Sequence, residues 1–419
     1  MRPTPEQFEE AWPRIVRALA GFTGSLDDAE EYAAEAVARA AAHDGPVDSL
    51  AAWCTTVAKR AWVDDHRRRA VESRLAPELA RPVAAAADPD THVDSDPIMS
   101  DDLDDRLALL FVACDEALPA GGQMVLALRV VCGLSIPEVA AHLGITETAA
   151  AARLTRSKKT LAQARGRFRI PDRSEQERRL PVVLDCVAGM FTVAHRTVLD
   201  PADALTDTAR QALSIADALV AAYPGDTEVR GLRAVIRLGL ARRPARVADD
   251  GTALALDEVD RSLWDGPLLR AGLTDAAVAA AGDGRFALEA AISGLHSHPG
   301  RFAETDWATV VLLYGALEQR WPSPSVRVAR LAARAHGLLA DREPVTDPSL
   351  VDDLAAVERE LTDLTGHPAA YVRRDAVLTL ADIEWRTARR HAAAVRYREL
   401  ADQLTAEPLR RFCLRRAGS

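Results

Sequence analysis

Cysteine and aromatic residues are scarce in this 419-residue chain: it has five cysteines, and aromatic side chains make up 5% of it. Cys54, Cys114, Cys132, Cys186 and Cys413 are widely spaced and include no C-x-x-C pair. That spacing argues against a disulfide framework and against a typical zinc site. We therefore expect buried thiols in a reducing compartment.

Long apolar runs are also missing. No stretch approaches the roughly 20 apolar residues that a membrane-spanning helix needs, and the first residues, MRPTPEQFEEAW, lack the apolar centre of a signal peptide. We expect a soluble, cytoplasmic protein with no membrane partner. The net charge of −10 argues against indiscriminate coating of nucleic acid, so any DNA contact must come from a local basic patch.

Signatures of catalysis are absent as well. The chain contains no P-loop, no G-x-S-x-G, no H-E-x-x-H and no G-x-G-x-x-G that opens a helix after a strand. His296 and His298 lie near Asp306, but no third ligand is suitably spaced, and two such histidines are more typical of an exposed loop than of a metal site. We expect no enzyme activity, no metal and no cofactor.

Alanine and other helix formers are abundant, which favours an all-α fold. The most informative stretch covers residues 133–169 and reads as a helix-turn-helix. Ser135 with Glu138 forms a capping box that predicts a helix start, and Gly144 supplies the positive φ that a tight turn needs. Thr146 then predicts the N-cap of a second helix.

Every charged residue from 153 to 169 is positive, namely Arg153, Arg156, Lys158, Lys159, Arg165, Arg167 and Arg169. A recognition helix in a major groove needs short side chains where it enters and cations where it passes the phosphates. The alternative is an ordinary helical hairpin with a solvated basic face. We place Thr148, Ala149, Ala152 and Arg153 near base edges, and Arg156, Lys158 and Lys159 on phosphates.

Residues 8–74 predict three or four further helices. The second has a strongly acidic start, with Asp28, Glu30, Glu31 and Glu35. After a polar loop, a helix from about residue 50 combines aromatic and basic side chains: Trp53, Lys59, Arg60, Trp62, Arg67 and Arg68. A surface that binds single-stranded nucleic acid requires aromatic rings on which bases stack and cations that face the phosphates. The alternative is a plain helical bundle with Trp53 in its core.

Residues 76–102 are rich in Ala, Pro and Asp. Eight aspartates and no Lys or Arg lie between residues 88 and 105, which predicts a linker with little order of its own. Beyond it, residues 103–172 hold the helix-turn-helix domain.

Residues 173–419 predict paired helices in a tetratricopeptide-like array, because a helix, a Pro-Gly-Asp turn and a second helix follow one another at residues 209–245. A charged and aromatic cluster is a candidate regulatory surface for a protein or peptide ligand: Asp260, Arg261, Trp264, Asp265, Asp306 and Trp307. Alternatively, Arg261 pairs with a buried carboxylate and the tryptophans fill the core.

Taken together, these motifs resemble an extracytoplasmic-function sigma factor of bacterial RNA polymerase, of the group with a C-terminal tetratricopeptide-like extension. The carrying residues are 28–31 with Glu35, 52–60, Ser135 with Glu138, 143–146, 153–156, 257–265 and 304–307. The resemblance implies that residues 1–75 bind core RNA polymerase through the acidic helix and the minus-10 strand through the aromatic and basic helix. It implies that residues 103–172 bind minus-35 promoter DNA and that residues 173–419 regulate.

Two readings of this resemblance stay open. In that family the linker mimics nucleic acid inside the polymerase, whereas a solvated spacer is the simpler interpretation of residues 76–102. The alternative function is a DNA-binding helical-repeat scaffold that no longer binds core polymerase, because Ala34 and Ala150 depart from the family pattern.

Overall fold

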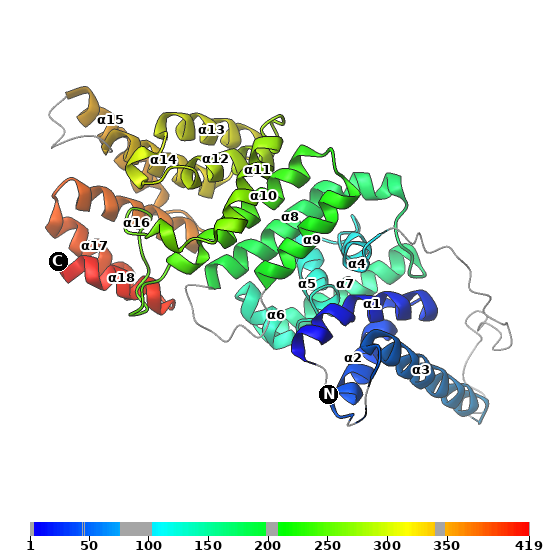
Figure 1. The fold of residues 1–419 in the computed structure, drawn as a ribbon. Coiled ribbons are helices and arrows are strands. Elements are labelled where there is room, and N and C mark those ends of the chain that lie inside the picture. Colours follow the sequence, from blue (N-terminus) through cyan, green and yellow to red (C-terminus); the bar gives the residue numbers. More distant parts are fainter. Residues whose placement is uncertain are drawn as a thin grey trace. The chain divides into compact units, whose positions relative to one another are not determined.

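The computed structural model describes residues 4–43, 45, 47–75, 103–197, 208–339 and 348–418. Within these residues the chain forms eighteen α-helices and three short 3-10 helices, with no strand (Figure 1). The all-α prediction is confirmed. The chain divides into two compact units, Met1–Cys186 and Val187–Ser419. The predicted linker, residues 76–102, lies outside the described part of the chain.

The first unit begins with three helices, α1 (Pro5–Thr23), α2 (Leu26–Ala41) and α3 (Leu50–Leu75). A capping box of Thr4 and Gln7 starts α1, and Gly24 at φ +73° ends it. Ser25 then caps α2 by accepting from the Asp28 amide at 3.2 Å. Because these caps are local, both helix starts follow directly from the sequence. Ile15, Val16 and Leu19 form the buried stripe of α1.

Four helices follow: α4 (Asp105–Ala113), α5 (Ala120–Val130), α6 (Ile136–Leu143) and α7 (Glu147–Arg165). Their core contains fully buried Phe111, Leu126 and Leu128. The next helix, α8 (Arg173–Thr197), starts in the first unit and ends in the second. The predicted domain limit at residue 172 therefore coincides with the start of α8, while the compact units separate inside that helix.

Asp115, just after α4, ties α7 and α8 to the rest of the first unit. Arg165 donates to its carboxylate at 2.8 and 3.0 Å, and Arg179 of α8 donates at 2.6 Å. Burial alone would raise the pKa of Asp115, but the hydrogen bonds from Arg165 and the Ala117 amide outweigh it, together with the nearby charge of Arg179. The pKa of Asp115 consequently lies below its ordinary value.

The second unit is a succession of helices: α9 (Thr208–Ala222), α10 (Thr227–Arg242), α11 (Gly266–Ala279), α12 (Arg285–Ser297), α13 (Trp307–Arg320), α14 (Pro324–Leu339), α15 (Pro348–Leu364), α16 (Ala370–Arg386), α17 (Arg390–Ala401) and α18 (Glu407–Gly418). The short 3-10 helices are η1 (Arg243–Ala245), η2 (Arg261–Leu263) and η3 (Phe302–Glu304). From α9 to α18, helices that are neighbours in sequence pack on each other. This is the contact pattern of a helical array.

Two features hold α10 against its neighbours. At Gly231 an added Cβ would lie 2.5 Å from the backbone of Phe286, so only glycine permits this approach of α10 to α12. Buried Asp275 of α11 accepts from three arginines of α10: Arg230, Arg233 and Arg237. Among the described residues, no helix has both the length and the apolar composition that crossing a membrane requires.

Candidate nucleic-acid and polymerase interface

The helix-turn-helix forms as the sequence predicts. Ser135 caps α6 and completes the capping box with Glu138, whose carboxylate accepts from the Ser135 amide at 2.6 Å. Gly144 ends α6 at φ +63°, and Thr146 caps α7 by accepting from the Ala149 amide at 3.2 Å. Each signal acts within a few residues of itself, which is why sequence reasoning found it.

The N-terminal part of α7 presents short side chains outward. Thr148 and Ala152 are exposed, Ala149 and Arg153 are half-buried, and Ala150 is buried beneath them. Farther along the helix, Arg156 and Lys159 are exposed cations. The structure therefore places six of the seven residues predicted to contact the minus-35 element on the accessible side of α7, although Ala149 and Arg153 only in part.

Lys158, the seventh, is turned onto the acidic helix of the same unit. Its Nζ lies 2.7 Å from Asp27 and 2.6 Å from Glu30, and the Lys158 side chain is only 14% exposed. The Glu30 side chain is 7% exposed and also receives Arg129 of α5. Lys158, a predicted phosphate contact, is thus ion-paired with Glu30, a predicted polymerase contact. Sequence reasoning did not foresee this pairing.

The remaining acidic residues of α2 divide into two groups. Asp28 is half-buried and accepts a hydrogen bond from Trp62 Nε1 at 3.3 Å. Glu31 and Glu35 are exposed, and within the described part of the chain the ion-pair partner of Glu35 is Arg39, one turn later. Two of the four predicted polymerase contacts are therefore open to a partner, while the other two are engaged within the chain.

The two tryptophans of α3 have different neighbours. Trp62 packs edge-on against Phe22 at 5.3 Å and stacks on His66 at 4.0 Å. Trp53 is half-buried beside His43, with ring centroids 5.4 Å apart.

The basic residues of α3 differ in how far they are engaged. Lys59 lies 5.0 Å above the Phe22 ring, Arg60 and Arg67 are exposed, and Arg68 lies 3.8 Å from Asp65. Asp65 also accepts from Tyr32 at 2.8 Å, and burial together with this bond raises the pKa of Tyr32 to about 12.

Three longer-range contacts join the α1–α3 bundle to the helix-turn-helix domain. Trp12 Nε1 donates to the Val130 carbonyl at 3.0 Å in the interior, and Arg17 donates to the Leu103 carbonyl at 2.7 Å. The Phe168 amide donates to the Gly24 carbonyl at 2.8 Å. Sequence reasoning missed this interface. The only signal was the position of Trp12 on the apolar stripe of α1.

In the second unit, the three aspartates of the predicted regulatory surface are helix caps. Asp260 caps η2, Asp265 caps α11 and Asp306 caps α13. Their side chains are exposed at the surface but already accept backbone amides.

The other members of that cluster lie deeper. Trp264 and Trp307 are each only 7% exposed. Arg261 donates to the Pro299 carbonyl and lies 4.9 Å above Trp264, and among the described residues no buried carboxylate pairs with it. His296 lies in the last turn of α12 against Trp307, not in a loop, and burial lowers the pKa of His296 to about 4.

Comparison with known proteins gives this geometry a family. A model described as sigma-70 region 2 matches residues 8–71, which cover most of α1–α3, and one described as sigma-70, region 4 matches residues 109–161. A family of unknown function, DUF6596, matches residues 179–280. An uncharacterized protein, R00370, from Rhizobium meliloti (strain 1021) is 34% identical over 334 residues, 77% of each chain.

No solved structure matches the chain. The two sigma-70 regions support a sigma-factor-like role in transcription initiation, that of a transcription factor and not of an enzyme. The chain belongs to the sigma-70 family, with region 2 and region 4 followed by a C-terminal DUF6596 extension.

Proposed function

We propose that this protein is a sigma factor of the extracytoplasmic-function type that directs core RNA polymerase to specific promoters. The protein itself acts in the cytoplasm. The observation that carries the proposal is that one compact unit contains two elements. One is the α1–α3 bundle, in which α2 has an acidic first turn, and the other is a capped helix-turn-helix whose second helix, α7, is cationic. The exposed carboxylates Glu31 and Glu35 then meet polymerase first. Asp28 and Glu30 join them when their internal contacts open.

The DNA contacts divide between two helices. On α3 the minus-10 strand is met by Trp53, Lys59, Arg60, Trp62, Arg67 and Arg68. On α7 the minus-35 duplex is met by Thr148, Ala149, Ala152 and Arg153 at base edges and by Arg156, Lys158 and Lys159 on phosphates. Because Lys158 is held by Asp27 and Glu30, full engagement of phosphates by α7 requires that α2 and α7 separate.

The C-terminal unit modulates this activity, with a protein or peptide as its ligand. Its proposed surface combines the exposed aspartates Asp260, Asp265 and Asp306 with Leu263, whose side chain is 58% exposed. An acidic surface with an apolar centre fits a basic partner segment. Arg261, Trp264 and Trp307 support that surface from below.

Run-off transcription with core polymerase on a genomic fragment library tests the proposal. Full-length protein and a chain ending at residue 197 are compared. A stop at residue 172 is a poor choice, because it removes α8 and with it Arg179, which binds Asp115. Defined transcripts that depend on the added protein are the expected result, with a changed yield from the shorter chain. No protein-dependent start point from either chain would refute the sigma assignment.

The alternative is a DNA-binding regulator that does not bind core polymerase. One observation favours it, namely that Asp28 and Glu30 are engaged inside the chain. Co-sedimentation with core polymerase separates the two functions, because only a sigma factor forms a stable complex. A Glu31→Gln/Glu35→Gln protein is the matched variant, since both side chains are exposed and outside the internal contact.

A further inference from the structure

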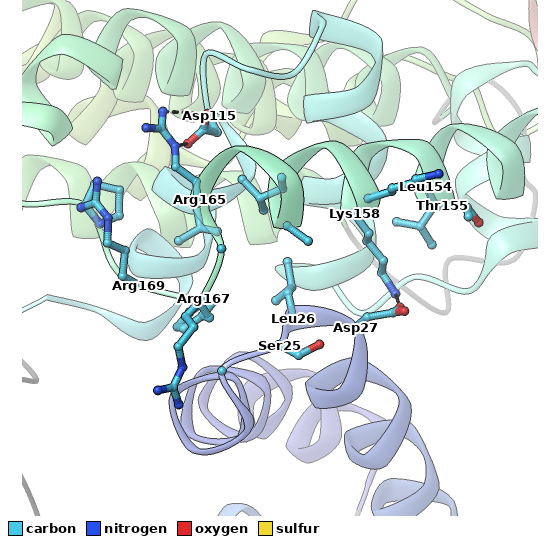
Figure 2. A pocket seen from close by; sticks show the side chains of 18 of the residues that line it. Ser25, Leu26, Asp27, Asp115, Leu154, Thr155, Lys158, Arg165, Arg167 and Arg169 are labelled. Carbon is cyan, nitrogen blue, oxygen red and sulfur yellow. Dashed lines mark hydrogen bonds and ion pairs between the residues drawn. The ribbon is translucent and has the colours of Figure 1, made fainter. Parts of the chain in front are cut away.

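A cavity of about 400 Å³ lies in the first unit between the start of α2 and the second half of α7 (Figure 2). Its apolar walls include Leu26 of α2, Val112 of α4 and Leu154 of α7, and residues 166–171 close one side. The volume falls within the range of small-molecule sites in proteins, which are typically apolar clefts with a few polar groups. No residue that lines it was singled out in the sequence as part of a small-molecule site.

The charges that line this cavity are mostly positive: Lys158, Lys159, Arg165, Arg167, Arg169 and Arg179, against only Asp27 and Asp115. Four of the cations are paired. Figure 2 shows Lys158 reaching from α7 to Asp27, and Arg165 meeting Asp115 at the other end of that helix. Arg179 also binds Asp115, and Arg169 pairs with Glu175.

Lys159 and Arg167 remain without an ion pair among the described residues, and both are exposed. The first turn of α2 is acidic, so the dipole of that helix is already matched and is not the source of the site. Two unpaired cations beside an apolar cavity suit a ligand that carries an anionic group on an apolar body. We propose that this cavity binds a small amphipathic anion, a compact apolar molecule with one sulfonate, carboxylate or phosphate group.

The walls come from both sigma regions, Leu26 from the region 2 bundle and Leu154 from the region 4 domain. The complete cavity therefore exists only while α2 and α7 are in contact. A ligand that binds only this closed arrangement raises the closed-to-open ratio by the factor 1 + [L]/Kd, about elevenfold at ten times Kd. It also occupies the neighbourhood of Lys158 and Lys159, so it opposes promoter binding, a consequence that rests on the proposed function.

Calorimetric titration of the full-length protein with 1-naphthalenesulfonate tests binding directly, with inorganic sulfate and 1-naphthalenemethanol as partial probes. We expect one saturable site for the sulfonate and affinities at least about tenfold weaker for each partial probe, since each lacks one recognised feature. Equal affinity for sulfate would show that the apolar body of the ligand contributes nothing to binding. Equal affinity for the neutral alcohol would show that the anionic group contributes nothing. No saturable binding would overturn the proposal.

Variants locate the site. Lys159→Gln and Arg167→Gln should each weaken sulfonate binding several-fold, whereas Arg156→Gln, on the same helix but outside the lining, should not. Thr155→Trp places a large ring at an exposed position of the cavity wall and should block binding without disturbing the buried core. Unchanged affinity in the first two variants, or full binding by the tryptophan variant, would refute this location.

The effect of the ligand on the contact between α2 and α7 is measured by pulsed electron paramagnetic resonance, as the distance between spin labels at Glu35→Cys and Thr148→Cys. Both positions are exposed, and the five native cysteines are buried, which favours selective labelling. Added 1-naphthalenesulfonate should increase the short-distance population. Binding without that change would overturn the coupling to closure. A protein that binds the probe but never supports transcription would instead refute the sigma assignment and leave the site intact.

Discussion

Replacing Glu30 with glutamine tests the contact that holds α2 against α7. The substitution preserves the shape of the side chain but removes its charge, so Arg129 and Lys158 are left facing each other without their shared anion. Both cations lie within ion-pair distance of Glu30, and its side chain is almost fully buried. The Lys158 ion pair with Glu30 lacks the angle of a hydrogen bond, so its contribution is mainly coulombic.

The magnitude follows from how far each partner is compensated. Removing one partner of a buried ion pair costs about 3–5 kcal/mol when the other is left alone. Here Lys158 keeps Asp27, which is 73% exposed and contributes little, and Arg129 keeps the Leu134 carbonyl at 2.8 Å. A loss of about 1–3 kcal/mol from the closed arrangement is therefore expected, which corresponds to about a 5- to 150-fold change in the closed-to-open ratio.

Fluorescence anisotropy with a labelled promoter duplex and no polymerase measures the consequence. When the closed state dominates, the apparent Kd is the intrinsic Kd divided by the open fraction, so Glu30→Gln should tighten DNA binding by nearly the same factor. Glu35→Gln is the matched control, because that side chain is exposed and its ion pair, with Arg39, lies within α2. Transcription is not the readout, since Glu30 is also a proposed polymerase contact. Unchanged or weaker DNA binding by Glu30→Gln would refute the reasoning.

Three further predictions concern stability. Asp275→Asn leaves three arginines of α10 around a neutral side chain and should cost about 3–5 kcal/mol, seen as a lower urea midpoint for the C-terminal unit. Trp12→Phe removes the donor to the buried Val130 carbonyl and should cost about 1–3 kcal/mol, measured by thermal unfolding with Trp53→Phe, at a half-buried position, as control. Because the pKa of Asp115 lies below 3.8, its contribution is present above that pH and lost as the pH falls through the folded value. In Asp115→Asn, the free energy of unfolding should therefore fall less steeply as the pH is lowered below 3.8. An unchanged slope in that range would contradict the lowered pKa of Asp115.

Local interactions were determined by the sequence alone. The capping box of Ser135 and Glu138, the positive φ of Gly144 and the cap at Thr146 each act within four residues, so their chemistry is readable from spacing. The caps at Asp260, Asp265 and Asp306 are equally local and were also readable. Sequence reasoning instead assigned those aspartates to a binding surface, because an exposed carboxylate suits both roles.

Which charged surfaces meet was decided only by the tertiary structure. Lys158 and Glu30 are more than a hundred residues apart, and a lysine on a basic helix has the same local pattern whether it faces solvent, phosphate or carboxylate. Likewise, the cavity beside Leu26 and Leu154 exists because two helical domains touch there. Periodicity specifies the buried face of each helix, but it carries no information on the partner. That choice is settled by shape and charge over the whole folded surface.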